Sequence, residues 1–148
     1  MPSFQELFEE SQGQPITYQG RTLVMADDFP VAENEILHLH FESTRSEWRQ
    51  GVYLTVERGA IRVNEHDCQD GALLWYDTAP ATVRLQVTGR ARSIEVRNTW
   101  DSGNGVVDSW HHGAAMIVEE MTNGRRYLCN DGHPDDDFDD IVFSIIRS

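Results

Sequence analysis

Six aspartates fall within ten consecutive residues near the end of the sequence: Asp131, Asp135, Asp136, Asp137, Asp139 and Asp140. We call residues 131–140 the acidic loop. It ends abruptly at an apolar run, residues 141–146, that reads as a buried β-strand. Carboxylates at this density repel one another, and protonation or a bound cation relieves the repulsion. Charged oxygen ligands suit Ca²⁺, which takes about six to eight oxygens in flexible geometry.

The acidic loop does not fit the EF-hand pattern. That motif requires glycine at its sixth position and glutamate at its twelfth, on a loop between two helices. Counted from Asp135, these positions hold Asp140 and Ile146. We therefore expect a calcium-binding loop of another kind, which leads directly into a strand.

The spacing of the aspartates suggests how they could converge. In an extended chain, residues i and i+2 share a side, so Asp135, Asp137 and Asp139 would face the same cation. Phe138 would then turn toward the core, and Asp140 would close the site at the start of the strand.

The pattern Asp-Gly, then Asp-x-Asp-aromatic-x-Asp and an alternating apolar strand, resembles the bacterial calcium-dependent fucose- and mannose-binding lectins. Similar loops occur in other secreted bacterial β-sandwich domains. In the lectins the matching carboxylates hold a pair of Ca²⁺ ions, and sugar hydroxyls coordinate those ions directly. The resemblance implies a Ca²⁺ cofactor, a carbohydrate ligand and the following metal ligands: Asp135, Asp137, Asp139 and Asp140, with Asn130 or Asp131 at the upstream acidic position.

The resemblance covers only about the last twenty residues of the chain. His133-Pro134 makes the spacing one residue longer than in the lectins, and the chain ends Arg147-Ser148 where the lectins end on glycine. It therefore favours calcium more than it favours sugar.

A second oxygen-rich segment lies at residues 101–108. Asp101, Asn104 or Asp108 could complete a calcium shell from a neighbouring turn. The alternative is that these side chains cap a turn in which Gly103 and Gly105 supply positive φ.

His38 and His40 lie on one side of an expected strand, as in a cupin-type metal site. His111 or His112 could supply a third ligand. The alternative is a stripe facing solvent, opposite the apolar residues of the same strand.

Most of the chain alternates between apolar and polar residues with period two. Short segments of this kind, about ten residues apart and separated by Gly, Asn and Asp turns, are typical of an antiparallel sandwich. Phe4, Leu7 and Phe8 have helical spacing, which predicts a short helix over residues 3–10. Gln19-Gly20 separates two short apolar segments and predicts a hairpin. We expect an all-β, jelly-roll-like sandwich with a short N-terminal helix, in one domain over residues 1–148.

Composition limits the classes of partner. The formal net charge is −13, and without the six aspartates of the acidic loop it is −13 + 6 = −7. Nucleic acid and anionic membranes are therefore disfavoured, because both require a basic surface. Neither a signal peptide nor a membrane span is recognisable, so we expect a cytoplasmic protein or one exported without a signal. The two cysteines predict reduced thiols rather than a disulfide scaffold.

The sequence thus predicts a non-enzymatic calcium-binding protein, with carbohydrate as a candidate ligand and a homodimer as an open alternative for its assembly. Catalytic motifs such as a nucleophile elbow or a phosphate-binding glycine loop do not occur. Two other interpretations remain: a cupin-like metal-dependent protein that uses His38 and His40, and a structural or interaction protein without a dedicated ligand.

Overall fold

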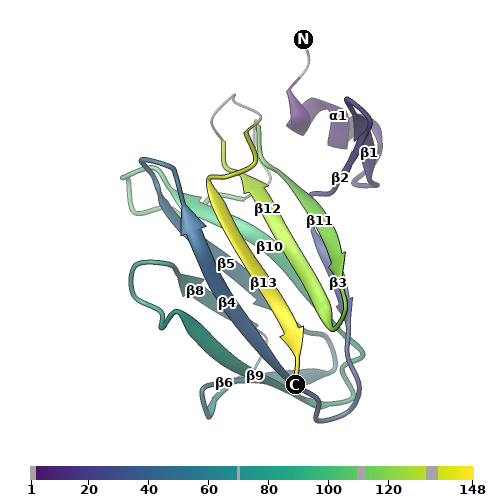
Figure 1. Cartoon of the computed structure of the whole chain (residues 1–148), viewed down its shortest axis with the longest axis vertical. Helices are drawn as coiled ribbons and strands as arrows, with labels where there is room; N and C mark the ends of the chain where they lie inside the picture. Colours follow the sequence, from purple (N-terminus) through teal and green to yellow (C-terminus); the bar gives the residue numbers. More distant parts are fainter. Residues whose placement is uncertain (1–2, 70, 110–112, 133–136) are drawn as a thin grey trace.

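The computed structural model describes residues 3–69, 71–109, 113–132 and 137–148, and it forms two packed antiparallel β-sheets with one short helix (Figure 1). The expected all-β sandwich is confirmed. Its elements in chain order are α1 (Phe4–Glu10), β1 (Ile16–Tyr18), β2 (Arg21–Leu23), β3 (Asp27–Pro30), β4 (Ile36–Thr44), β5 (Arg49–Thr55), β6 (Gly59–Val63), β7 (His66–Cys68), β8 (Gly71–Trp75), β9 (Thr82–Gly89), β10 (Ser93–Asp101), β11 (Ala115–Met121), β12 (Gly124–Asn130) and β13 (Ile141–Arg147).

The two layers contain strands from alternating parts of the chain. The smaller sheet has the order β3-β10-β5-β8, and the larger has the order β11-β12-β13-β4-β9-β6-β7. From β4 to β10 the chain passes repeatedly from one sheet to the other, as it does in a jelly roll. Among the described residues, no helix is long and apolar enough to cross a membrane.

The main core lies between the sheets and follows the alternation of the sequence. In β4, Leu37 and Leu39 are fully buried, whereas His38 and His40 on the opposite face are partly exposed. Strands β9 and β10 alternate in the same way, with Val83, Leu85, Val87, Ile94 and Val96 buried. Each such aliphatic side chain stabilises the fold by about 1.5–3 kcal/mol on burial.

A second, smaller core holds the N-terminal segment against the sandwich. It consists of five buried residues: Phe4, Phe8, Leu23, Ala115 and Phe138. The Ser3 side chain caps α1 by accepting a hydrogen bond from the Glu6 backbone N–H at 3.2 Å, as expected for a helix N-cap. This core joins α1 to the acidic loop through Phe138, so the predicted helix has a packing role.

The predicted hairpin is also present. Strands β1 and β2 pair antiparallel around Gln19 and Gly20, which both have positive φ, 51° and 77°. Two consecutive residues with positive φ are typical of the type I′ turn, whose twist matches that of two paired strands.

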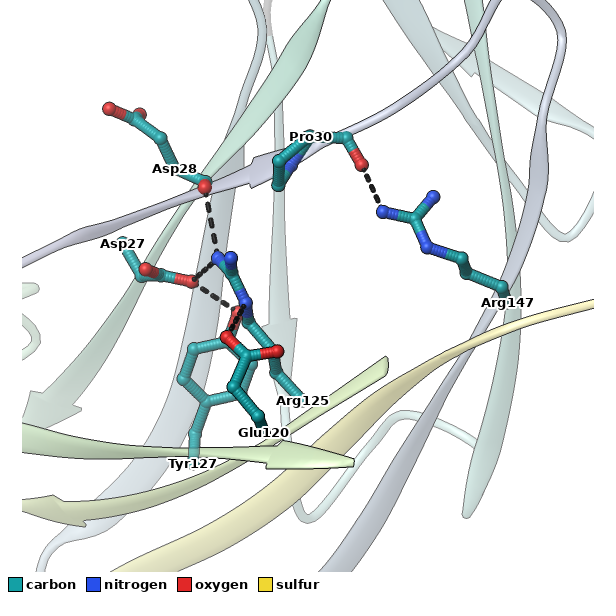
Figure 2. Close-up of polar contacts among 7 residues, drawn as sticks. All are labelled: Asp27, Asp28, Pro30, Glu120, Arg125, Tyr127 and Arg147. Carbon is teal, nitrogen blue, oxygen red and sulfur yellow. Dashed lines mark hydrogen bonds and ion pairs between the residues drawn. The ribbon is translucent and has the colours of Figure 1, made fainter. Parts of the chain in front are cut away.

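Two arginines of the larger sheet connect it to β3 at the edge of the smaller one (Figure 2). Arg125 Nη1 lies 2.8 Å from Asp27 Oδ2, and the Tyr127 hydroxyl donates to the same oxygen at 2.7 Å. Arg147 Nη2 donates to the carbonyl oxygen of Pro30 at 2.7 Å. The guanidinium groups therefore fix the separation of the sheets along this edge.

Candidate functional site

The acidic loop connects two neighbouring strands at one end of the sandwich. Cys129 near the end of β12 pairs with Ile141 at the start of β13, so both ends of the loop are held by the same ladder. Asp131 at its start and Asn130, the last residue of β12, are fully buried, and Asp140 at its end is 3% exposed. Burial of carboxylates is costly unless hydrogen bonds or opposite charges compensate it.

Asp131 is held by Ser46 in the turn between β4 and β5 and by Gln50 near the start of β5. Its Oδ2 accepts hydrogen bonds from Ser46 Oγ at 2.5 Å and from Gln50 Nε2 at 2.9 Å. The backbone N–H of Trp48 donates to Ser46 Oγ, and Gln50 Nε2 also donates to the Trp48 carbonyl oxygen, both at 3.2 Å. The turn and the start of β5 thus wrap one face of the carboxylate with donors.

Asp140 lies beside Asp131. Its Oδ2 accepts a hydrogen bond from the Asp131 backbone N–H at 2.9 Å. Its own backbone is fixed on both sides, because its N–H donates to Cys129 and its carbonyl oxygen accepts from Arg45. The two buried aspartates therefore belong to one hydrogen-bonded unit. Burial, together with the Asp140 carboxylate, raises the pKa of the neighbouring Cys129 thiol.

Phe138 anchors the middle of the loop. Its side chain is 1% exposed in the second core, which confirms that it turns inward. Its φ is 56°, however, and its N–H donates to Asn130 Oδ1 at 2.7 Å. The backbone is thus left-handed at this residue rather than extended, so the expected i, i+2 alternation does not run through it. On either side of Phe138, Asp137 is exposed and Asp139 is half-buried.

The predicted ligands differ in how the structure places them. Asp131 and Asp140 come together as buried side chains, while Asp137 and Asp139 lie nearer the solvent. Asn130 uses its side-chain oxygen to hold the loop backbone. Asp135 lies outside the described residues. Within the described ranges, no three His, Cys, Asp or Glu side chains form a group that could hold a metal ion.

Among the buried side-chain oxygens without a hydrogen-bond partner within the described part of the chain are Gln50 Oε1 and Thr99 Oγ1, on residues that are 3% and 1% exposed. Gln50 is the residue whose amide nitrogen contacts Asp131. Buried polar atoms in native structures usually have a partner, so an unpartnered one calls for a water, an ion or a ligand.

Sequence reasoning missed Ser46 and Gln50, which contact Asp131 from a part of the chain more than eighty residues away. They lie in the segment Ser-Glu-Trp-Arg-Gln, residues 46–50, which contains no metal-binding spacing. No signal in the sequence could have linked this segment to the acidic loop, because the sheet order alone brings them together.

The second oxygen-rich segment uses its side chains to cap its own turn. Asp101 Oδ1 accepts from the N–H groups of Gly103 and Gly105 at 2.8 and 3.1 Å, and Asn104 Oδ1 accepts from Val106 at 3.0 Å. Asp108 pairs through its backbone with Trp100. These contacts match the turn-capping alternative.

His38 and His40 lie on the outer face of β4, with ring centroids 6.4 Å apart. His40 Nδ1 is 2.9 Å from Thr82 Oγ1 on the neighbouring strand β9. His111 and His112, the candidates for a third ligand, lie outside the described residues. His38 and His40 thus form a stripe on the outer face of β4, and Leu37 and Leu39 fill its inner face.

Comparison of the chain with models of known protein families, with curated proteins and with solved structures found no match.

Proposed function

We propose that this protein binds Ca²⁺ at the acidic loop and that the ion fixes the shape of the loop. The observation that carries the proposal is the pair of buried carboxylates, Asp131 and Asp140, that share one hydrogen-bonded unit. Both lie at the base of a loop that contains four more aspartates. Charges of one sign at this density favour a divalent cation.

The surroundings of Asp131 support the same conclusion. Gln50 Oε1 is a buried amide oxygen without a hydrogen-bond partner among the described residues, and its amide group already touches Asp131. Amide oxygens are ordinary Ca²⁺ ligands beside carboxylates. Asp131, Asp140 and Gln50 would form the floor of the site, Asp137 and Asp139 would approach from the solvent side, and Asp135 would be a further ligand.

Thermal unfolding tests the proposal. A ligand that binds only the folded state adds about 2.7 kcal/mol at a hundredfold excess over Kd. Millimolar Ca²⁺ should raise Tm by several degrees relative to EDTA, and Asp140→Asn should remove most of that shift. Asp67→Asn is the matched control, because Asp67 lies on β7 at the far edge of the larger sheet. Identical melting curves with Ca²⁺ and EDTA would contradict the proposal, as would an unchanged shift in Asp140→Asn.

Carbohydrate is the ligand that the lectin resemblance suggests for such an ion. Sugar hydroxyls would replace water on the bound Ca²⁺, so glycan binding should depend on the metal. We expect a glycan array to show binding with Ca²⁺, loss of that binding with EDTA, and retention of it in the variant His38→Gln, which changes the outer face of β4. If the calcium-loaded protein binds no glycan on the array, the ion has a structural role and the lectin part of the proposal fails.

A further inference from the structure

A concave site lies at the opposite end of the sandwich from the acidic loop. Strand β4 runs between the two ends, from Ile36 to Thr44, which pairs with Ile141 beside the loop. The opposite end, near the C terminus in Figure 1, contains the β5-β6 and β9-β10 connections. Between these turns and the outer face of β3 and β10 lies a pocket of about 970 Å³. Small-molecule sites have volumes of roughly 300–1,000 Å³.

Three arginines line this pocket: Arg58, Arg90 and Arg92. We call it the arginine pocket. The protein has twelve arginines and no lysine. Within the described chain, six arginines outside the pocket form ion pairs with carboxylates. None of the three pocket arginines takes part in those pairs, although the protein carries a large excess of acidic side chains. Unpaired guanidinium groups gathered in a concavity are suited to bind an oxyanion.

Backbone hydrogen bonds hold the main chain at these arginines in place. Arg58 has a φ of 62°, and its carbonyl oxygen accepts a hydrogen bond from the Arg90 N–H at 2.7 Å. A Cβ atom at Gly59 would lie 2.2 Å from the Thr88 carbonyl oxygen of β9. The two backbones can therefore approach this closely only because residue 59 is glycine. Val31 N–H donates to the Arg92 carbonyl oxygen at 2.9 Å. Left-handed backbone at a residue other than glycine is often maintained at a functional site.

The floor of the pocket carries the opposite charge. Asp28 on β3 and Glu95 on β10 are direct cross-strand partners and both line the pocket. Like charges in this position destabilise a sheet. The Glu95 carboxylate forms an ion pair with Arg97. The Asp28 carboxylate points away from Arg125 in Figure 2. Glu33 and Glu57, in the connections around the pocket, also line it, so the pocket presents carboxylates as well as guanidinium groups.

We propose that the arginine pocket binds a small zwitterionic molecule, with an oxyanion group at Arg58, Arg90 and Arg92 and an amine above Asp28 and Glu95. A ligand with only an anionic group would face the carboxylates of the floor, and a ligand with only an amine would face the guanidinium groups. A molecule with both charges can pair with both kinds of group. This site is separate from the acidic loop, and it does not depend on calcium.

Isothermal titration calorimetry in EDTA at constant ionic strength tests the proposal with three probes: O-phosphoethanolamine, inorganic phosphate and ethanolamine. O-Phosphoethanolamine should bind at least about tenfold more tightly than either of the other two. Arg90→Gln and Arg92→Gln should each weaken its binding about tenfold, since hydrogen bonds to charged groups contribute about that much. Arg84→Gln, on β9 outside the pocket, makes the same change in charge and should leave binding unchanged.

The variant Asp28→Asn tests the contribution of a floor carboxylate separately from that of the arginines. It should remove the preference for O-phosphoethanolamine over inorganic phosphate and leave the affinity for phosphate at least as high. The Asp28 backbone oxygen, which accepts from Arg125, is unaffected by this change. Absence of binding by O-phosphoethanolamine would overturn the proposal. So would binding no tighter than that of phosphate, or binding that the arginine variants do not weaken.

Discussion

Replacing Phe138 with alanine is expected to lower the free energy of unfolding by about 3–5 kcal/mol, which is the usual cost of truncating a buried phenylalanine. The side chain is 1% exposed and is a member of the second core. Its ring lies 6.0 Å from that of Phe4, and the Arg21 guanidinium lies 5.1 Å from its centroid. The variant would leave a cavity between α1 and the acidic loop. Urea denaturation of the two proteins in EDTA measures the difference.

The same change should weaken calcium binding, because Phe138 fixes the backbone between Asp137 and Asp139. Phe29→Ala is the matched control: Phe29 is also 1% exposed, but it lies on β3, beneath Arg125 and Arg147. Both variants should lose stability, and only Phe138→Ala should also lose much of the stabilisation by Ca²⁺. A loss below about 1 kcal/mol in Phe138→Ala would contradict the anchoring role. Equal stabilisation of both variants by Ca²⁺ would show that Phe138 does not contribute to calcium binding.

The architecture could be predicted wherever a strand has one face in the core. In β4, β9 and β10 the apolar residues alternate, and the structure buries those residues. Strand β3 was not predicted, because Asp27, Asp28 and Pro30 leave only Phe29 as an apolar residue. This edge strand pairs with β10 and contacts Arg125 and Arg147 of the other sheet, all distant in the sequence, so no local pattern reveals it.

The candidate site could be predicted only in its acidic part. The density of aspartates in residues 131–140 identified the loop, and the inward position of Phe138 was predicted from the alternation expected of an extended chain. The left-handed backbone of Phe138 could not be anticipated, because that conformation is uncommon outside glycine and depends on the Asn130 side chain. The donors to Asp131 come from a turn and from the start of β5, and their position beside the acidic loop depends on the sheet order. They are Ser46 and Gln50.

High pH is expected to destabilise the protein through two buried groups, Tyr127 and Cys129, which are both 0% exposed. Burial and the neighbouring Asp27 carboxylate raise the pKa of Tyr127, and burial and Asp140 raise the pKa of Cys129. The native state therefore keeps both groups neutral, whereas in the unfolded chain they ionise near their ordinary pKa values of about 8.5 for the thiol and 10 for the phenol. Stability from these groups is fully present below the unfolded-state values and is lost as the pH rises above them.

Each group contributes a slope of about 1.4 kcal/mol per pH unit between its unfolded-state pKa and its raised native pKa, so stability should decline above about pH 8.5 and more steeply above about pH 10. Urea denaturation in EDTA between about pH 8 and pH 11 measures the slope. Cys129→Ala should abolish the decline that begins near pH 8.5, and Tyr127→Phe should reduce the slope above pH 10, although each variant will be less stable at neutral pH. If the variant with both substitutions loses stability with pH as steeply as the parent protein, other groups cause the alkaline loss and this assignment is wrong.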